Sequence, residues 1–100
     1  MAIIGIDLGT TNSLAAVWRN GTSELIPNSL GEYLTPSVVS VDSDGTILVG
    51  AAARDRLITH PEHTAAGFKR SMGTGRRYEL GSRVFTAEDL SSFVLRRLRE

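Results

Sequence analysis

Residues 5–13 read GIDLGTTNS and combine one acidic side chain with a turn rich in backbone N–H groups and hydroxyls. Asp7 closes a β-branched run that begins at Ile3, and such a run favours a strand. Gly9 then lets the backbone turn at little steric cost. The N–H groups after it can converge on one small volume and so form an anion-binding nest. They belong to Thr10, Thr11 and Asn12.

A carboxylate beside such a nest suits hydrated Mg²⁺, which keeps several waters and takes few protein ligands. We therefore interpret Asp7 as a metal-binding residue and Gly9 with residues 10–12 as a phosphate-binding group. The stretch is neither a P-loop nor a dinucleotide fingerprint, because GxxxxGK[ST] and GxGxxG are both absent. The alternative is a plain hairpin whose Gly and Thr only satisfy turn geometry, which an isolated D-x-G would favour.

Lys69, in the sequence FKRSMG, is the second candidate for chemistry. We expect a helix over residues 64–72, stopped by Gly73, with an apolar stripe that includes Phe68. At about 100° per residue, Lys69 borders that stripe and Arg70 lies nearly opposite. A lysine at such a border can lay its stem on apolar surface and reach into a cleft. Periodicity alone leaves open whether Lys69 and Arg70 are simply a solvated basic pair.

The elements that must position these residues alternate between strands and helices, which favours an α/β fold with a mixed sheet. Asn20-Gly21 and Asp44-Gly45 are hairpin turn signals. The second strand is apolar on both faces, so we expect helices to cover both sides of its sheet. We predict strands at 3–7, 13–19, 22–26, 37–41, 47–49, 78–80 and 83–85, with residues 27–36 irregular. We predict helices at 51–58, at 64–72 and after a capping box of Thr86 and Asp89, the last with the apolar stripe Leu90, Phe93, Val94 and Leu98.

The composition is that of an ordinary globular chain, with 41% apolar and 22% charged residues. The formal net charge is zero, which argues against nucleic acid as a partner. The second half is mildly basic, with ten Lys or Arg against six acidic residues, which suits an anion site. There is no cysteine, no export signal and no apolar run near the ~20 residues of a membrane span, so we expect a cytoplasmic protein without a membrane partner.

Four blocks together resemble the amino-terminal part of the 70-kDa heat-shock chaperones of the DnaK type, which belong to the actin-like ATPase superfamily. GIDLGTTNS is similar to the first phosphate-binding hairpin of that superfamily. LTPSVVSV matches the family's TPS strand, ILVGAAA its strand-to-helix junction, and HPEHTAAGFKRSMG its segment with a KR pair. Residues 76–86 are shorter than the usual family segment, as in the divergent HscC-type branch.

The resemblance implies an α/β, ribonuclease-H-like lobe and an ATPase that uses ATP/ADP and Mg²⁺. It implies that Asp7 helps hold hydrated Mg²⁺, and that Thr10, Thr11 and Asn12 contact phosphates. It gives Lys69 the catalytic role, at the γ-phosphate and the attacking water, and Arg70 a supporting one. It also implies unfolded peptide segments as clients and a J-domain protein as co-chaperone.

Two members of the same superfamily remain alternatives: an actin-like filament protein that determines cell shape, and a sugar kinase. Asn12-Ser13 and Lys69 favour the chaperone. A third possibility is a structural piece that binds nothing by itself. We expect residues 1–100 to be one amino-terminal piece of an ATPase domain, without an internal boundary and truncated at the carboxyl end. The second phosphate hairpin would lie downstream, so the piece would be inactive alone. We also expect it to self-associate through the apolar stripe of its last helix.

Overall fold

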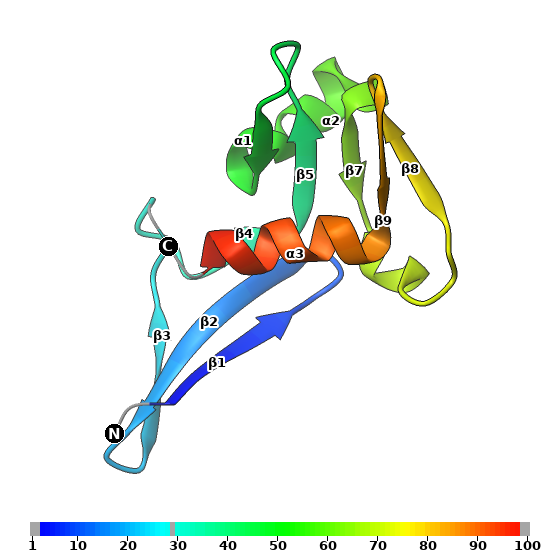
Figure 1. Cartoon of the computed structure of the whole chain (residues 1–100). Helices are drawn as coiled ribbons and strands as arrows, with labels where there is room; N and C mark the ends of the chain where they lie inside the picture. Colours follow the sequence, from blue (N-terminus) through cyan, green and yellow to red (C-terminus); the bar gives the residue numbers. More distant parts are fainter. Residues whose placement is uncertain (1–2, 29, 99–100) are drawn as a thin grey trace.

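The computed structural model describes residues 3–28 and 30–98, which form three small sheets joined by one long helix (Figure 1). The first sheet is a meander in which β2 pairs antiparallel with both β1 and β3, and a two-residue strand, β4, pairs antiparallel with the start of β2. Its strands are β1 (Ile3–Leu8), β2 (Asn12–Arg19), β3 (Thr22–Ile26) and β4 (Thr35–Pro36). The meander predicted around the loop of residues 9–12 is therefore confirmed.

A second sheet begins one residue after the first one ends. Ser37 alone separates β4 from β5 (Val38–Val41), the central strand of this sheet. Strand β6 (Ile47–Val49) returns beside β5 after the Asp44-Gly45 turn, as predicted. Strand β7 (Thr64–Ala66) pairs with the other edge of β5. The path of the chain thus places the two sheets directly beside one another.

The last part of the chain is a hairpin followed by the longest helix. Strands β8 (Arg77–Leu80) and β9 (Arg83–Thr86) pair around Gly81, and α3 (Ala87–Leu98) follows at once. The predicted capping box is confirmed: the Asp89 amide donates to the Thr86 hydroxyl at 3.1 Å, and the Thr86 amide donates to the Asp89 carboxylate at 3.0 Å. These two bonds satisfy amides that the first turn of a helix leaves without intrahelical partners.

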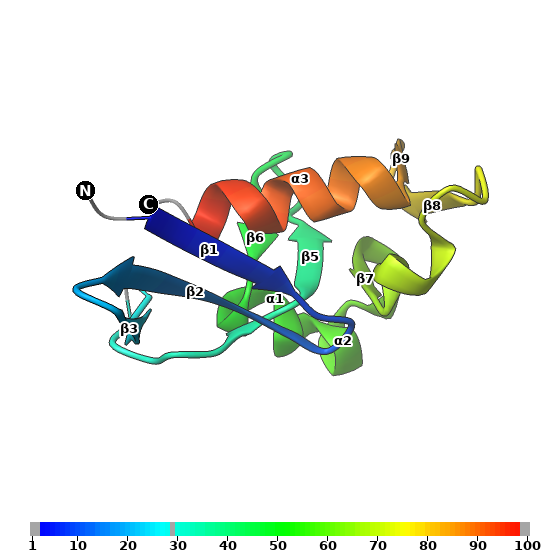
Figure 2. The same cartoon turned by 90° about the horizontal axis from the view of Figure 1, so that it is seen from below.

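Helix α3 supplies one side of the hydrophobic core and also reaches the first sheet (Figure 2). Leu90 and Val94 are fully buried, and the rings of Phe93 and Phe85 meet edge to face at 5.6 Å. Leu8, at the end of β1, packs on the edge of this cluster. The buried core residues are Val39, Val41, Ala65, Phe68, Leu80, Phe85, Ala87, Leu90 and Val94.

This packing corrects the expectation that the stripe of Leu90, Phe93, Val94 and Leu98 mediates self-association. Leu90 and Val94 have no exposed surface, and Phe93 and Leu98 pack on the same core. The stripe is already used within the chain. Self-association through another surface stays a prediction.

The helix predicted over residues 64–72 is wrong. The first three of these residues form β7, and Phe68–Ser71 form a short 3₁₀-helix, η2, after Gly67 with φ of 68°. Residues 64–66 form a strand because they pair with the free edge of β5. The spacing of apolar residues cannot predict such a non-local contact.

The helix predicted over 51–58 is present but divided at Asp55 into α1 (Ala51–Arg54) and α2 (Arg56–Thr59). Pro61 opens a second 3₁₀-helix, η1 (Pro61–His63), with His60 at its cap.

The first sheet is less covered than its sequence predicts. Ala15 and Val17 are buried on one face of β2, as expected for a sheet with a packed side. On the other face Trp18 and Leu25 are each about half exposed. The described residues therefore do not provide helical cover on both faces. Among these residues, no helix has the length and apolarity to cross a bilayer.

Truncation of Leu90 tests whether α3 closes the core. Leu90→Ala removes a fully buried side chain and should lower the free energy of unfolding by about 2–5 kcal/mol. The matched control is Leu95→Ala on the same helix, where the side chain is 37% exposed and the loss should stay below about 1 kcal/mol. Urea denaturation followed by circular dichroism measures both, and equal losses would contradict this view of the core.

Candidate functional site

The loop between β1 and β2 is tight enough to require glycine at its first position. A Cβ atom added at Gly9 would collide with the backbone carbonyl oxygen of Asn12. Backbone cannot give way as the end of a flexible side chain can, so a larger residue at Gly9 would force the loop open. The glycine of the predicted nest is therefore a steric requirement of this turn.

Ser37 holds this loop from the inter-sheet side. Its backbone N–H donates to the Thr11 carbonyl at 2.8 Å, and its hydroxyl donates to the Gly9 carbonyl, also at 2.8 Å. Ser37 itself is 2% exposed, so the donor end of both bonds is buried. Sequence reasoning matched the TPS block to a family but gave Ser37 no task, because its partners are 26 and 28 positions away in the chain.

A cleft of about 530 Å³ opens between this loop and the second sheet. The three predicted nest residues, Thr10, Thr11 and Asn12, form one wall of it. The other wall comes from the start of β5 and from the segments that flank the second sheet, including Gly67 before η2. A smaller hollow of about 270 Å³ between β6, α1 and α3 contains none of the predicted site residues.

Two arginines line the cleft together with the nest residues. Arg54 is the last residue of α1, and Arg70 lies in η2. None of the described lining residues is acidic, so the cleft has a positive charge that suits a phosphate group. Sequence analysis missed Arg54 and left Arg70 without a clear role. The basic second half of the chain predicted an anion site, but only the fold shows which arginines reach it.

Asp7 and Lys69 do not line the cleft with the nest residues. Asp7 is exposed near the end of β1, opposite Leu14 of β2. Lys69 is exposed on η2, between buried Phe68 and buried Ser71. Because residues 64–72 are not one helix, the periodicity argument for Lys69 no longer holds. Its catalytic role stays a prediction that rests on the resemblance.

The donor set fits Mg²⁺ held mainly through water. Asp7 is a carboxylate two residues before the loop, and the described residues contain no group of three His, Cys, Asp or Glu side chains that could enclose a metal. Mg²⁺ needs no such enclosure, because it keeps several waters and uses phosphate oxygens as ligands.

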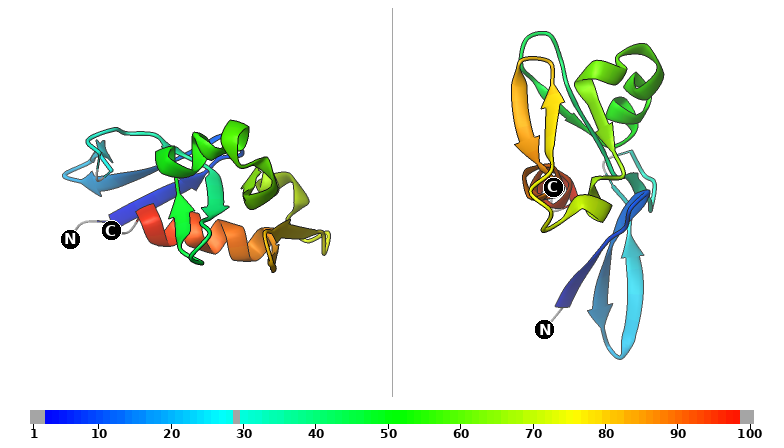
Figure 3. Two further views of the ribbon diagram at one scale, coloured as in Figure 1. Left: turned by 90° about the horizontal axis from the view of Figure 1, so that it is seen from above. Right: turned by 90° about the vertical axis from the view of Figure 1, so that its right-hand side faces the viewer.

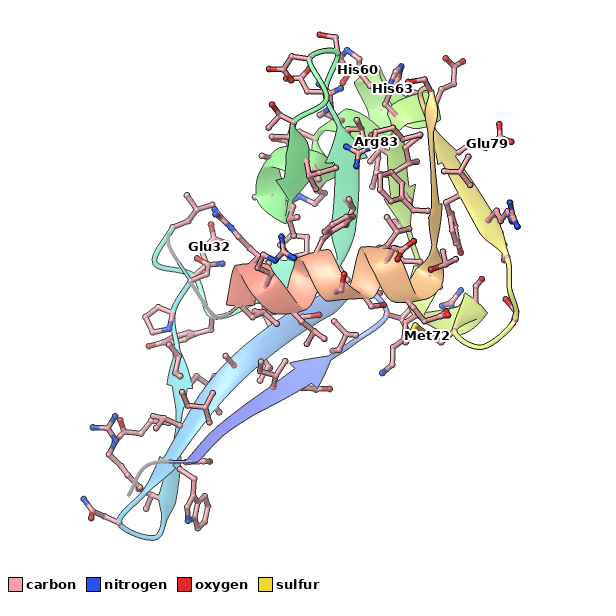
Figure 4. The ribbon with its side chains drawn as sticks, in the orientation of Figure 1. Glu32, His60, His63, Met72, Glu79 and Arg83 are labelled. Carbon is pink, nitrogen blue, oxygen red and sulfur yellow. The ribbon has the colours of Figure 1, made fainter. Side chains whose placement is uncertain are left out.

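The two histidines lie away from this site. Figure 4 shows His60 and His63 at the end of the molecule beside the β8–β9 turn, whereas the β1–β2 loop lies below α3. The His63 ring packs against Gly81, where an added Cβ would come within 2.8 Å of Nδ1. This contact favours a structural role for His63.

Comparison with known proteins decides the family. A sequence model of the family described as "Hsp70 protein" matches residues 3–82 of the chain. The chain belongs to the Hsp70 family. The chaperone protein DnaK of Endomicrobium trichonymphae is 45% identical over 102 residues, which cover 98% of this chain and 16% of that protein. DnaK of Thermotoga neapolitana is 42% identical over 99 residues (98% of this chain and 17% of that protein), and DnaK of Thermotoga maritima is 43% identical over 98 residues (97% and 16%).

These findings confirm the resemblance inferred from the four sequence blocks. The Hsp70 ATPase domain is actin-like, and the mixed sheets and helices of this chain agree with part of its amino-terminal lobe. The filament protein and the sugar kinase are not favoured. The chain spans about one sixth of the length of the curated relatives, at 16–17% of each.

Glycine substitutions in and beside the loop test its steric requirement. Gly9→Ala should destabilise the chain by about 1–3 kcal/mol and shift the backbone NMR signals of residues 10–12, because the new Cβ meets the Asn12 carbonyl. Gly5→Ala is the matched control, since an added Cβ at Gly5 in β1 meets nothing within 4 Å. Wild-type signals for residues 10–12 in Gly9→Ala would show that the turn is not constrained.

Proposed function

We propose that this chain provides the first phosphate-binding loop of a chaperone ATPase. The whole protein would bind and hydrolyse Mg·ATP and use that cycle to control its affinity for unfolded peptide segments. The observation that carries the proposal is the loop of residues 9–12, which is held by Ser37 and whose residues 10–12 line a cleft together with two arginines. Anion nests and guanidinium groups are both suited to phosphate oxygens.

In this proposal different residues of the chain bind the phosphates, offset their charge and hold the metal. The backbone amides of residues 10–12 and the hydroxyls of Thr10 and Thr11 bind phosphate oxygens, while Arg54 and Arg70 in the same cleft offset the negative charge. The Asp7 carboxylate would accept hydrogen bonds from the water ligands of hydrated Mg²⁺. When bound, Mg²⁺ neutralises charge on the phosphate oxygens. Phosphoryl transfer depends mainly on positioning and charge stabilisation, which amides, arginines and an ammonium can supply.

Lys69 supplies the ammonium in this proposal. The side chain is exposed on η2, next to Arg70, which lines the cleft. A lysine stem is long enough and free enough to bring its ammonium to the γ-phosphate and the attacking water once nucleotide is bound. Lys69 would then act in the transition state more than in nucleotide binding.

The partners and location follow from the family. As an Hsp70, the whole protein would bind unfolded clients and a J-domain co-chaperone in the cytoplasm. The formal net charge of zero over these 100 residues gives no electrostatic reason to expect nucleic acid as a partner.

Substitution of Lys69 in the full-length protein tests the catalytic assignment. Lys69→Ala should reduce single-turnover hydrolysis by about 10²–10³, because it removes a charge that acts as negative charge develops. Affinity for ATP should change much less, since the loop amides remain. Arg77→Ala is the control, because Arg77 is an exposed cation on β8 outside the cleft. Near-normal turnover in Lys69→Ala would make Lys69 a solvated surface residue.

The same assay separates Asp7 from Lys69. Asp7→Asn keeps the shape of the side chain but removes the charge that holds the hydrated metal. It should raise the Mg²⁺ concentration needed for half-maximal hydrolysis, whereas Lys69→Ala should leave that concentration unchanged. An unaltered Mg²⁺ requirement in Asp7→Asn would exclude Asp7 from the metal site.

The isolated chain should bind Mg·ATP only weakly, with a dissociation constant in the millimolar range, about −4 kcal/mol or weaker. Residues 1–100 contain no D-x-G-G-G-T stretch that resembles the second phosphate hairpin of the superfamily, so the chain supplies only part of the groups that would bind the phosphates. Calorimetric titration measures the constant. A micromolar value would show that these residues form a complete site.

A further inference from the structure

Behind the loop, two serine hydroxyls form a buried pair. Ser13, in β2, has no exposed surface, and Ser37 has 2%. Their Oγ atoms are 2.8 Å apart, which is a short hydrogen bond. Neither hydroxyl is needed to fill apolar volume, and a buried polar pair is costly unless it is well satisfied. The hydrogen-bond partners of the pair must therefore explain why two polar groups are buried here.

The protons in this pair can be assigned from the geometry. A serine hydroxyl has one proton to donate and two lone pairs that accept. The Ser37 proton goes to the Gly9 carbonyl, because a carbonyl oxygen can only accept. The bond between the two hydroxyls must then carry the Ser13 proton to the Ser37 oxygen. The result is a directed chain from Ser13 through Ser37 to the first residue of the loop.

Ser37 also fixes the far end of the loop through its own backbone. Its N–H donates to the Thr11 carbonyl, so one residue holds the carbonyls of Gly9 and Thr11 at the same time. The peptide bonds of the described residues contain no cis form, and in a planar trans peptide the C=O and the next N–H point in opposite directions. With those two carbonyls turned toward Ser37, the N–H groups of Thr10 and Asn12 are turned away from it.

We propose that Ser37, supported by Ser13, is the positioning residue of the phosphate loop: it fixes two peptide planes and thereby presents the amides of Thr10 and Asn12 to a phosphate. Neither serine needs to touch the nucleotide for this purpose. The inference rests on the proposed role of the loop in phosphate binding. It assigns to the first serine of the SVVSV segment a specific effect on affinity that a general structural role would not have.

A second buried serine on the same segment provides the matched control. Ser40, in β5, is also fully buried and bonds through its hydroxyl, but its partners lie away from the loop. It donates to the His63 carbonyl at 3.0 Å, pairs with the Thr64 hydroxyl at 2.9 Å and accepts from Arg56 Nε at 2.7 Å. Ser40→Ala should therefore cost stability without changing the orientation of the loop amides.

The test compares Ser37→Ala, Ser13→Ala and Ser40→Ala in the full-length protein. Hydrogen exchange without ligand, measured by mass spectrometry on peptides that cover residues 8–13, reports whether the loop is held, because the paired strand ends at Leu8 and Ser13 open more often when it is not. Ser37→Ala should speed exchange there about tenfold, Ser13→Ala less, and Ser40→Ala not at all, because Ser37 can still donate to Gly9 when Ser13 is truncated. Ser37→Cys, which leaves no cavity but is a weak donor, should follow Ser37→Ala.

Mg·ATP binding and turnover give the second readout. The KM of Ser37→Ala should rise about tenfold, by more than kcat falls, because the amides bind phosphate before and during transfer. Ser40→Ala should stay within about twofold of wild type in KM even where its urea midpoint falls. Equal effects of Ser37→Ala and Ser40→Ala on exchange and on KM would overturn the proposal. If the wild-type protein binds no Mg·ATP, the proposed function fails, while the exchange measurement still decides whether Ser37 holds the loop.

Discussion

The β1–β2 turn leaves backbone groups that it cannot pair within itself, and the rest of the structure is arranged around that constraint. A four-residue connection closed by Gly9 and Asn12 is too tight to satisfy all its carbonyls internally. Ser37 pairs with two of these carbonyls: its backbone amide donates to the Thr11 carbonyl, and its hydroxyl donates to the Gly9 carbonyl. The amides on the opposite side of the turn are thereby directed away from Ser37, as the proposed phosphate site requires.

Placing Ser37 there requires both sheets and α3. Pro36 has no N–H to donate and a fixed φ, which suits a short strand at the edge of β2. The chain then passes straight into β5, whose Val39 and Val41 are buried in the core with residues of α3. Leu8 joins the same core from the end of β1. The loop is thus anchored close to the best-packed part of the molecule, as the two views in Figure 3 allow the reader to follow.

Local signals in the sequence predicted the fold well where local chemistry decides it. The turns at Asn20-Gly21 and Asp44-Gly45 and the capping box before α3 each depend on residues only a few positions apart. Residues 64–72 were predicted wrongly because their apolar spacing suits a helix, while the free edge of β5 makes a strand of the first three. That edge is 24 or more positions away, beyond the reach of any local pattern.

The residues of the candidate site also fall into two groups: those that a local sequence pattern predicts and those that only the fold brings together. Gly9 and residues 10–12 were found from sequence because a nest is built from consecutive residues. Ser37, Arg54 and Arg70 come from three separate segments, and only the packing of the two sheets brings them to the loop. The family resemblance gave Lys69 a role, but the short η2 helix removes the geometric argument that periodicity offered.

The single residue between β4 and β5 has a mechanical consequence. Ser37 is the only covalent step from one sheet to the other at this point, and it is also the clamp on the loop. Any tilt of the second sheet against the first must turn the backbone of Ser37 and so pull on the carbonyls of Gly9 and Thr11. The nest lies on one sheet and the two arginines flank the other, so in the proposed function a phosphate that bridged them would resist the same tilt. Occupancy of the cleft and the angle between the sheets would then be coupled through the backbone and hydroxyl of Ser37.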